Sequence, residues 1–366
     1  MTAERPTWAE IDLGAYARNV GVIRALIGPK VKLFAVGKGD AYGLGSGEIA
    51  RAAIDAGADG LATSDPRDAE AIRRAGVSAP VLLYACTTPD IAAEVAGLGV
   101  IATIHDFGSL AAFAALAQPV EVFLKLDCGF GRLGFQPDDW PAVFAAALSA
   151  PDLRVTGLYT HIGHTGDPDL VAEQGRLFQR AGREAEAAGL RNFDLMAASS
   201  RVVIGYPDLF FTAVNTGGVL FGVLDEPWGD RVRVEPVLSA VKSRIIQIKD
   251  LPPGARIGYD APIAAPEPVR AAVVPFGFSN GYPRFPAGGH VLVAGASAPI
   301  MGSRGTEHTV IDVTAIPEAA VGAEVVLLGR QGDREITIAE LSELTGVPMI
   351  ELVPRLALGS PRVYLG

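Results

Sequence analysis

The sequence predicts an α/β protein: a (β/α)8 barrel followed by a mostly β C-terminal domain. Its 366 residues exceed what one ordinary core needs and suit a barrel together with a smaller domain. Over the first ~220 residues, short runs of Val, Ile and Leu alternate with alanine-rich stretches. After about Asp230, alternating apolar and polar stretches are separated by Pro and Gly turns, which is typical of β structure.

Eight apolar runs are typical of buried parallel strands, and eight such strands alternating with helices favour a closed barrel over an open sheet. The runs are Val31–Lys38, Asp59–Thr63, Val81–Ala85, Ile101–Ile104, Val120–Asp127, Val155–His161, Phe193–Ala198 and Ala213–Phe221. Helices are expected between them, for example at Glu48–Ala56, Arg67–Ala75 and Pro168–Ala188.

The predicted domains are residues 1–230, the barrel, and residues 231–366, the β-rich domain. The polar segment from Gly222 to Pro236 contains Pro227 and Gly229 and is a plausible linker. The N-terminal strand is a candidate to pack with the second domain. That domain should hold strands within Ala240–Lys249, Val269–Phe276, His290–Val293 and Val325–Leu328, and one late helix at Ile338–Thr345.

Composition excludes several classes of protein. A formal net charge of -10 argues against a nucleic-acid partner, which requires basic patches. Cys86 and Cys128 are the only cysteines, too few for a disulfide framework or a thiolate zinc site, and no metal site is expected. Residues 1–6 show no signal peptide and the apolar runs are too short for a membrane span, so a cytoplasmic protein is expected.

Candidate functional residues lie at the strand ends, where a barrel carries its chemistry: Lys38, Lys125, Asp127, His161 and Ser200. Lys38 comes before a loop with four glycines, which would let the backbone approach a bound group closely. A lysine in an apolar site can lose its proton and attack an aldehyde. The alternative is a solvent-reaching lysine beside a flexible loop.

The segment Ala35–Gly45, AVGKGDAYGLG, resembles the AVVKANAYGHG motif of the alanine racemases, which are fold-type III enzymes that use pyridoxal 5'-phosphate. Gly37, Gly39, Asp40 and Leu44 differ from that motif. Further segments resemble the family along nearly the whole chain, namely Thr7–Asp12, Leu124–Gly134, Gly157–His161, Val274–Arg284, Leu328–Asp333 and Pro361–Tyr364.

The resemblance implies that Lys38 holds the cofactor as a Schiff base and exchanges the Cα proton on one face of the substrate. The second base would be Tyr259, supplied by the partner subunit of a homodimer. Arg132 would lie near the cofactor's phenolic oxygen and the substrate carboxylate, with His161 beside the cofactor. A lone tyrosine is otherwise most often a half-buried packing residue, and a strand-end histidine is more often structural.

The phosphate is expected at Tyr42, by resemblance. It is also expected at Ser200, which follows strand seven, and at Gly217 and Gly218 in strand eight, because barrels often bind phosphate after these strands. A plain turn is the alternative for the two glycines. The resemblance also suggests that Lys125, carbamylated in many relatives, steers Arg132. The alternative for Lys125 is a surface ion pair with Asp127, which would contribute little.

Gly129-x-Gly-x-x-Gly134 matches the dinucleotide fingerprint and follows a strand. A nucleotide fold would place this motif at the first strand, and Arg132 would crowd the pyrophosphate turn. We therefore expect no dinucleotide here.

Departures from the family concentrate around the cofactor ring and the substrate entrance. Asn215 stands where the family has an arginine against the pyridine nitrogen, and Met196 replaces a neighbouring histidine. Thr306 and Glu307 replace a substrate-contacting Met-Asp pair, and Phe278 and Leu358 replace two entrance tyrosines. These changes favour a substrate other than alanine, although neutral drift around an unchanged racemase gives the same pattern.

The first functional hypothesis is therefore an amino-acid racemase or epimerase. The second is another pyridoxal-phosphate reaction on the same scaffold, such as an aldolase, dehydratase or transaminase, because a neutral Asn215 would permit a longer-lived carbanion. The third is a non-catalytic carrier of the cofactor. Retention of both Lys38 and Tyr259 argues against a carrier, which needs only the lysine.

Overall fold

The computed structural model describes residues 6–224, 228–257, 263–265, 267–284 and 286–366. Two compact units make up the chain. The first comprises Tyr16–Ala41 and Gly45–Glu235, and the second comprises the N-terminal segment up to Ala15, Tyr42–Leu44 and Pro236–Gly366.

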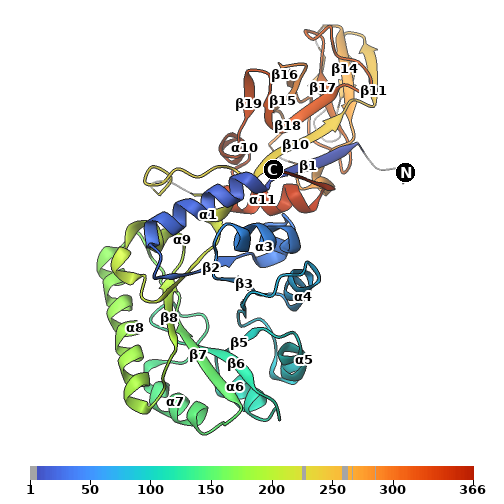
Figure 1. The fold of residues 1–366 in the computed structure, drawn as a ribbon. Helices are drawn as coiled ribbons and strands as arrows, with labels where there is room; N and C mark the ends of the chain where they lie inside the picture. The colour runs from blue at the N-terminus through green and yellow to red at the C-terminus, as the bar shows by residue number, and fades with distance from the viewer. Residues whose placement is uncertain (1–5, 225–227, 258–262, 266, 285) are drawn as a thin grey trace. The chain divides into compact units, whose positions relative to one another are not determined.

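The first unit contains a closed barrel of eight parallel strands, which confirms the predicted fold class (Figure 1). The last strand closes the barrel by pairing with the first, with Lys32 opposite Ala213 and Phe34 opposite Asn215. The strands are β2 (Lys32–Val36), β3 (Gly60–Thr63), β4 (Val81–Leu83), β5 (Ile101–Ile104), β6 (Val120–Lys125), β7 (Leu153–Tyr159), β8 (Asp194–Ala198) and β9 (Ala213–Thr216).

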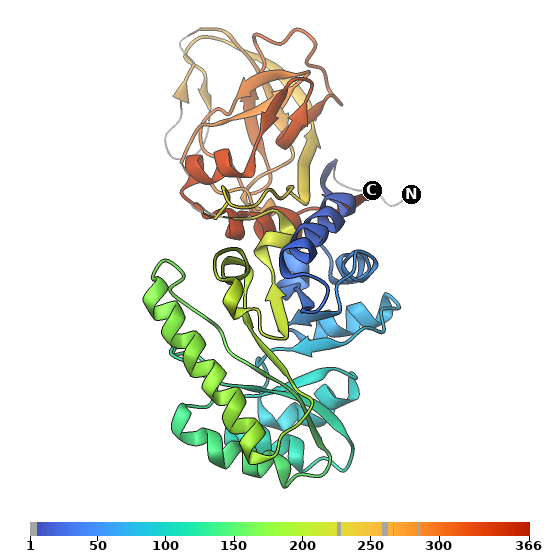
Figure 2. The ribbon, with the colours of Figure 1, turned by 60° about the vertical axis from the view of Figure 1, so that its left-hand side comes forward.

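Helices follow the strands and form the outer layer of this unit (Figures 1 and 2). Several begin where the sequence supplies an N-cap acceptor: Asp65, Asp106 and Asp167 each accept backbone N–H groups of the first helical turn. The helices are α1 (Leu13–Ile27), α3 (Ser46–Asp55), α4 (Pro66–Arg74), α5 (Ala92–Gly97), α6 (Phe107–Ala114), α7 (Trp140–Leu148), α8 (Pro168–Ala188) and α9 (Ser200–Gly205).

The eighth strand is shorter than predicted. It ends at Thr216, and Gly218–Phe221 forms the 3-10 helix η4 instead of continuing the strand. Gly217 leaves the extended conformation with φ -121° and ψ -93°, and its carbonyl accepts the N–H of Leu220. Gly217 and Gly218 therefore lie in a tight turn after the strand, outside the hydrogen-bonded sheet.

The barrel interior is filled by side chains that alternate along the strands. Its core contains Phe34, Val36, Ala62, Leu82, Ile101, Phe123, Tyr159, Met196 and Ala213, with Tyr84 packed against them. Position 157 next to this layer is a glycine, and a Cβ there would come within 2.3 Å of the Phe123 ring. The interior is thus a packed core of mainly apolar side chains.

The second unit is mostly β, as predicted (Figure 2). Its largest sheet has the strand order β16-β15-β18-β10-β1-β20, with β19 on β18, and β1 pairs antiparallel with β10 and parallel with β20. The strands are β1 (Thr7–Asp12), β10 (Leu238–Arg244), β15 (His290–Val293), β16 (Ala296–Pro299), β18 (Glu324–Gln331), β19 (Arg334–Ile336) and β20 (Arg362–Leu365).

Smaller sheets complete this unit. They are formed by β11 (Gln247–Leu251), β14 (Val269–Val274) and β17 (Thr309–Asp312), and by β12 (Arg256–Ile257) with β13 (Ile263–Ala264). The predicted strand Ala240–Lys249 is therefore two strands in different sheets. Helix α10 (Ile338–Thr345) agrees with the prediction, but α11 (Met349–Leu358) was not predicted, since it contains Pro354, a residue that normally interrupts a helix.

Gly281 lies where two segments of this unit approach closely. It has φ 85°, and a Cβ at this position would lie 1.9 Å from the carbonyl oxygen of Arg355 in α11. We expect Gly281→Ala to lower the free energy of unfolding by ~3 kcal/mol or more, of which the left-handed conformation accounts for about 1–2 kcal/mol. Gly254→Ala is the matched control, since it shares a positive φ of 80° but has no atom within 4 Å of the added Cβ. Equal losses in chemical denaturation would contradict the steric argument.

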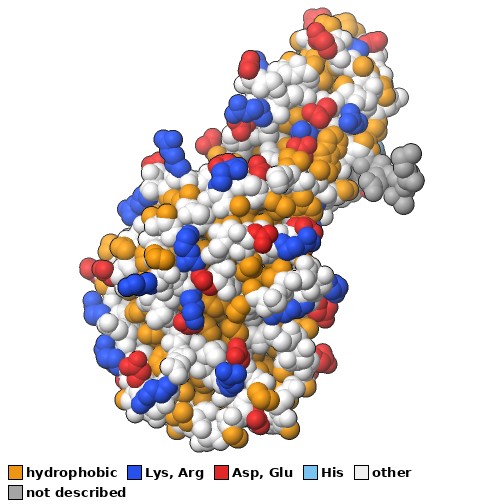
Figure 3. Space-filling model, in the orientation of Figure 1, with side chains coloured by type: hydrophobic (Ala, Val, Ile, Leu, Met, Phe, Trp, Pro, Cys, Tyr) orange, Lys and Arg blue, Asp and Glu red, His pale blue; other side chains and the backbone are white. Residues whose placement is uncertain are grey.

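Among the described residues, no helix is long and apolar enough to cross a membrane. On the face drawn in Figure 3, basic and acidic side chains are interspersed over the surface. Exposed ion pairs such as Arg18–Glu235, Lys32–Asp194 and Arg330–Glu335 are part of this pattern.

Candidate active site

Lys38 follows β2 and opens a short left-handed turn. Gly39, Asp40, Ala41 and Tyr42 all have φ between 54° and 61°. Only glycine adopts this conformation freely, and each other residue costs about 1–2 kcal/mol. Such local strain persists only where surrounding contacts impose it, and it concentrates at functional sites.

Hydrogen bonds hold this turn in place. The Asp40 carboxylate accepts the N–H of Ser46 at 2.8 Å, and the Asp40 carbonyl accepts the N–H of Gly45 at 2.9 Å. The N–H of Asp40 donates to the carboxylate of Asp68, which also accepts the hydroxyl of Thr63 at 2.7 Å. Two neighbouring strand ends and α4 thereby fix the backbone next to Lys38.

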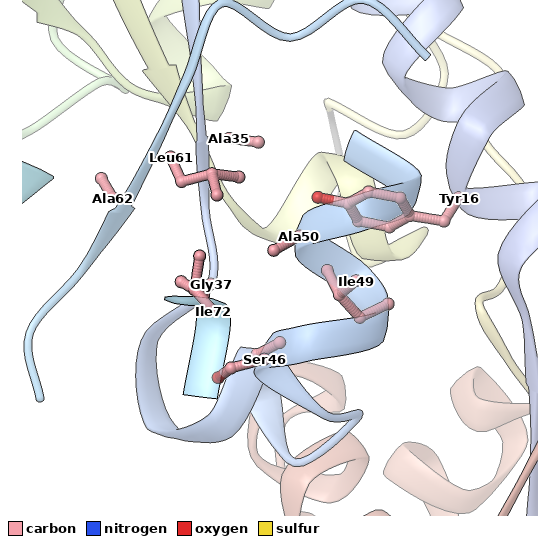
Figure 4. Close-up of a pocket in the computed structure, with 10 residues that line it drawn as sticks. Tyr16, Ala35, Gly37, Ser46, Ile49, Ala50, Leu61, Ala62 and Ile72 are labelled. Carbon is pink, nitrogen blue, oxygen red and sulfur yellow. The ribbon is translucent and has the colours of Figure 1, made fainter. Parts of the chain in front are cut away.

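A small cavity lies behind the turn, between β2, β3 and α3 (Figure 4). Its volume is about 10 Å³, and it is lined mainly by apolar side chains. Ligand pockets of proteins occupy several hundred Å³, so this space is a packing defect and does not hold a substrate. The lining residues are Tyr16, Ala35, Gly37, Ala41, Ser46, Ile49, Ala50, Leu61, Ala62 and Ile72.

The Lys38 amine is solvent-accessible, which a nucleophile requires. The surrounding protein, by removing water, and then the positive charge of Arg132 lower its pKa below the ordinary lysine value. More neutral amine is therefore present near pH 7 than an exposed surface lysine would provide. This is the protonation state that attacks a carbonyl carbon.

Lys125 ends β6 and is 6% exposed. Burial lowers its pKa to about 7, although the charges of Cys128 and Asp127 act in the opposite direction. The amine stands 4.6 Å from the centre of the Tyr159 ring. Lys125 is thus a buried lysine, and the alternative of a surface ion pair with Asp127 is wrong.

His161 follows β7 and is held neutral. Burial, and then the positive charges of Lys125, Arg132 and Lys38 in that order, lower its pKa to about 4. The imidazole therefore acts as a hydrogen-bonding group and not as a cation at neutral pH. Lys125, Arg132 and Lys38 are therefore close enough to His161 to lower its pKa.

Arg132 and His161 meet on the same aromatic ring. The guanidinium carbon of Arg132 is 4.6 Å from the centre of the Phe130 ring, and the His161 ring contacts Phe130 edge-on at 4.6 Å. Phe130 therefore orients both groups. Sequence reasoning did not single it out, although it lies within the segment Leu124–Gly134 that resembles the family.

The glycine-rich loop Gly129–Gly134 folds around the carboxylate of Asp127. Asp127 accepts the N–H groups of Gly129 at 3.0 Å, Phe130 at 2.9 Å and Gly131 at 3.0 Å. Burial alone would raise the pKa of Asp127, but these bonds and one from Gln136 lower it overall. Because Asp127 already occupies the loop's N–H groups, the loop has no place for a pyrophosphate.

We expect Asp127→Ala to destabilise the barrel by ~2–4 kcal/mol, because three backbone N–H groups lose a charged acceptor. A lowered folded-state pKa means that this contribution is present at neutral pH and is lost as the pH falls below the ordinary carboxyl pKa. Thermal unfolding at pH 7 and at pH 3 should therefore show a smaller difference between variant and wild type at pH 3. Asp138→Ala, at an exposed position in the same loop region, should change little at either pH.

A cluster of donors lies after β8 and β9. The Ser200 hydroxyl oxygen accepts the N–H of Gly217 at 3.1 Å and that of Val219 at 3.5 Å. The structure thus brings the predicted Ser200, Gly217 and Gly218 together at the ends of adjacent strands. Because the Ser200 oxygen is the acceptor in these bonds, its hydroxyl proton can be donated to an anionic group beside the glycines.

Asn215 points toward the barrel interior from β9 and is 7% exposed. Its amide Nδ2 donates to the Tyr84 hydroxyl at 2.9 Å, and its Oδ1 is buried without a hydrogen-bond partner among the described residues. Met196, fully buried, belongs to the adjacent core cluster. Sequence reasoning missed Tyr84, whose position immediately after β4 was the available signal.

Five of the predicted residues that the structure describes lie in the second unit. Tyr42 ends the left-handed turn, and burial raises the pKa of its hydroxyl. Thr306 accepts at its carbonyl from the Ser279 hydroxyl at 2.7 Å, and Glu307 follows it. Phe278 and Leu358 are 40% and 59% exposed, large values for such apolar side chains. Tyr259 falls outside the described residues.

Comparison with known proteins decides the family. Residues 11–225 match the alanine racemase N-terminal domain and residues 238–364 the alanine racemase C-terminal domain. The chain belongs to the alanine racemase family. It is therefore an isomerase, a racemase of the pyridoxal-phosphate-dependent kind.

Relatives in this family resemble the chain over its full length. The alanine racemase of Desulforamulus reducens is 31% identical, and the match covers 99% of this chain and 100% of the relative. A crystal structure of the Bacillus anthracis alanine racemase with bound L-Ala-P has a TM-score of 0.92 and 27% identity, covering 100% and 96%. A histidine racemase from Leuconostoc mesenteroides has a TM-score of 0.89 and 26% identity, covering 100% and 99%.

The residues present fit the family's cofactor. Lys38 supplies an accessible amine with a lowered pKa. The Ser200 hydroxyl, whose oxygen accepts the N–H groups of Gly217 and Val219, can donate its own proton to a phosphate. The buried Asn215 Oδ1 is a polar atom in need of a partner. Among the described residues, no group of His, Cys, Asp and Glu forms a metal site.

Proposed function

We propose that this chain is an amino-acid racemase or epimerase that exchanges the substrate's Cα proton between Lys38 and Tyr259, and that its substrate is not plain alanine. The observation that supports this most directly is the arrangement around Lys38. Lys38 is exposed, has a lowered pKa and stands on a strained but firmly held turn, and it lies within electrostatic reach of Arg132 and a neutral His161.

Each residue then has a defined task. Pyridoxal phosphate, when bound, supplies an aldehyde carbon for the substrate amine and a ring that withdraws electrons from Cα. The Lys38 Nζ holds or returns the Cα proton on one face of the substrate. The Tyr259 hydroxyl, contributed by the partner subunit of a homodimer, does so on the opposite face.

Positive charge at the barrel mouth serves the anionic parts of the ligands. Arg132 binds the substrate carboxylate, held against Phe130 by its cation–π contact. Ser200, Gly217, Gly218 and Tyr42 bind the cofactor phosphate. Neutral His161 orients the groups next to Lys38 by hydrogen bonding without adding another positive charge.

The substrate side chain should be larger than a methyl group. Phe278 and Leu358 are exposed apolar residues at positions where relatives have tyrosines, and Thr306 and Glu307 replace a Met-Asp pair. The similar structure named a histidine racemase supports the idea that this scaffold accepts other amino acids. Changing pocket contacts is the ordinary route to changed specificity.

A second candidate is a different reaction at Cα or Cβ, such as that of an aldolase, dehydratase or transaminase. Asn215 favours it, because a neutral partner at the ring removes a positive charge that would oppose electron withdrawal.

An NMR assay in deuterated water tests both candidates. The purified protein, loaded with pyridoxal phosphate, is given a panel of L- and D-amino acids, and Cα–H exchange and product identity are followed together. We expect exchange with formation of the opposite enantiomer for at least one substrate. Exchange with retention, a keto acid or a broken Cα–Cβ bond would support the second candidate. No turnover of any amino acid would leave a cofactor carrier and overturn the racemase proposal.

A further inference from the structure

Resting on the proposed cofactor, we infer that Tyr84 orients the Asn215 amide so that its carbonyl oxygen accepts a hydrogen bond from a protonated ring nitrogen. Tyr84 is thus a positioning residue, and Asn215 is the group that contacts the ring. The inference concerns the protonation state of the cofactor in this chain and goes beyond the assignment of a racemase.

The Asn215 amide has one end engaged and one end free. Nδ2 donates to the Tyr84 hydroxyl at 2.9 Å. Oδ1 faces away from that bond, is buried, and has no hydrogen-bond partner among the described residues. Leaving a buried acceptor without a donor costs about 1–3 kcal/mol, so the site is built to receive a donor.

The neighbouring residues do not supply that donor. Asn215 pairs across the ladder with Phe34, an apolar residue of the barrel core, and its Oδ1 has no donor among the described residues. A ring nitrogen that carries a proton can donate a hydrogen bond to Oδ1. A ring nitrogen without a proton is itself an acceptor, and its lone pair would repel Oδ1. The free carbonyl oxygen therefore selects the protonated ring.

Tyr84 is held rigidly enough to choose the amide orientation. Its N–H donates to the Thr63 carbonyl at 2.8 Å, and its ring packs 5.7 Å from that of Tyr159. Tyr159 is in turn bound through its hydroxyl to Thr103 at 3.2 Å. This chain of contacts fixes the position of the Tyr84 hydroxyl, and therefore of Nδ2.

The absence of a positive charge at position 215 also favours a protonated ring nitrogen. Asn215 is neutral, whereas an arginine at the position would place a permanent positive charge beside the ring and oppose its protonation. The nearby Lys125, whose amine stands over the Tyr159 ring, is buried and readily loses its proton. A protonated ring withdraws more electron density from Cα than an unprotonated one.

The test is the ¹⁵N chemical shift of the ring nitrogen in protein loaded with ¹⁵N-labelled pyridoxal phosphate. Wild type should give the shift of a protonated pyridine, and Asn215→Arg that of an unprotonated one. Tyr84→Phe should give a shift between the two, because the amide can then turn either end toward the ring. Tyr206→Phe, which removes a tyrosine hydroxyl that donates to the Thr165 carbonyl outside this network, should match wild type.

An unprotonated ring in wild type, or a protonated ring in Asn215→Arg, would overturn the inference. A wild-type shift in Tyr84→Phe would remove the role assigned to Tyr84. Borohydride reduction followed by mass spectrometry of the Lys38 peptide is measured on the same samples. Failure to find the cofactor on Lys38 counts against the proposed function, whereas attachment with the wrong ring shift counts against this inference alone.

Discussion

Lys38→Ala is expected to abolish covalent attachment of the cofactor and to lower the rate of Cα proton exchange by ~10³-fold or more. In the proposed mechanism the lysine supplies both the amine that holds the aldehyde and one of the two bases, and a positioned base alone contributes about 10²–10⁴-fold. The absorbance of the bound cofactor and the deuterium-exchange rate report the two losses separately. Added methylamine should restore part of the exchange, because it replaces the missing amine.

Lys32→Ala is the matched control for Lys38→Ala. Lys32 begins the same strand, is exposed, and forms an ion pair with Asp194 at 2.8 Å. Exposed pairs contribute about 0–1 kcal/mol, so stability should fall slightly and activity should stay unchanged. Full activity in Lys38→Ala, with Lys32→Ala also active, would remove Lys38 from the chemistry.

Tyr259→Phe is expected to lower racemisation by ~10²–10⁴-fold while leaving the cofactor bound to Lys38. A two-base reaction makes the loss asymmetric. The enantiomer whose Cα proton faces Lys38 should still exchange that proton for deuterium, but with retention of configuration, since the opposite face has no proton donor. The measurement is NMR of the deuterium content of each enantiomer combined with chiral chromatography.

Tyr206→Phe separates this effect from a general loss of stability. The Tyr206 hydroxyl donates to the Thr165 carbonyl at 2.6 Å, so its removal costs a hydrogen bond within the barrel unit. It should lower the melting temperature slightly and leave both enantiomers racemised. Equal slowing of exchange from both enantiomers in Tyr259→Phe would show that Tyr259 is not a base for one face.

Local patterns along the chain were enough to predict much of the fold. The boundaries of α8 and α10 agree with the prediction, because N-cap residues, helical periodicity and left-handed glycines just after each helix act within a few residues. The prediction failed where a non-local contact overrides the local signal. Helix α11 forms despite Pro354, with Leu352, Val353 and Leu356 of this helix buried.

The candidate site divides in the same way. Lys38, His161 and Ser200 were predicted because each follows a strand, and Arg132 because it lies in a motif that resembles the family. Tyr84 and Phe130 could not be predicted, since their importance depends on a partner far along the chain. Tyr84 bonds to a residue 131 positions away, and Phe130 contacts a histidine 31 positions away.

The sequence by itself therefore determined the succession of barrel strands along the chain, the residues at their ends and the family, because these depend on short-range pattern and on motifs. Only the tertiary structure decided which strand-end side chains meet, which amines lose their ordinary pKa and which amide oxygen is left without a donor. Those properties depend on burial and on charges brought together by barrel closure. Desolvation and Coulomb interactions act through space, at distances that position along the chain does not specify.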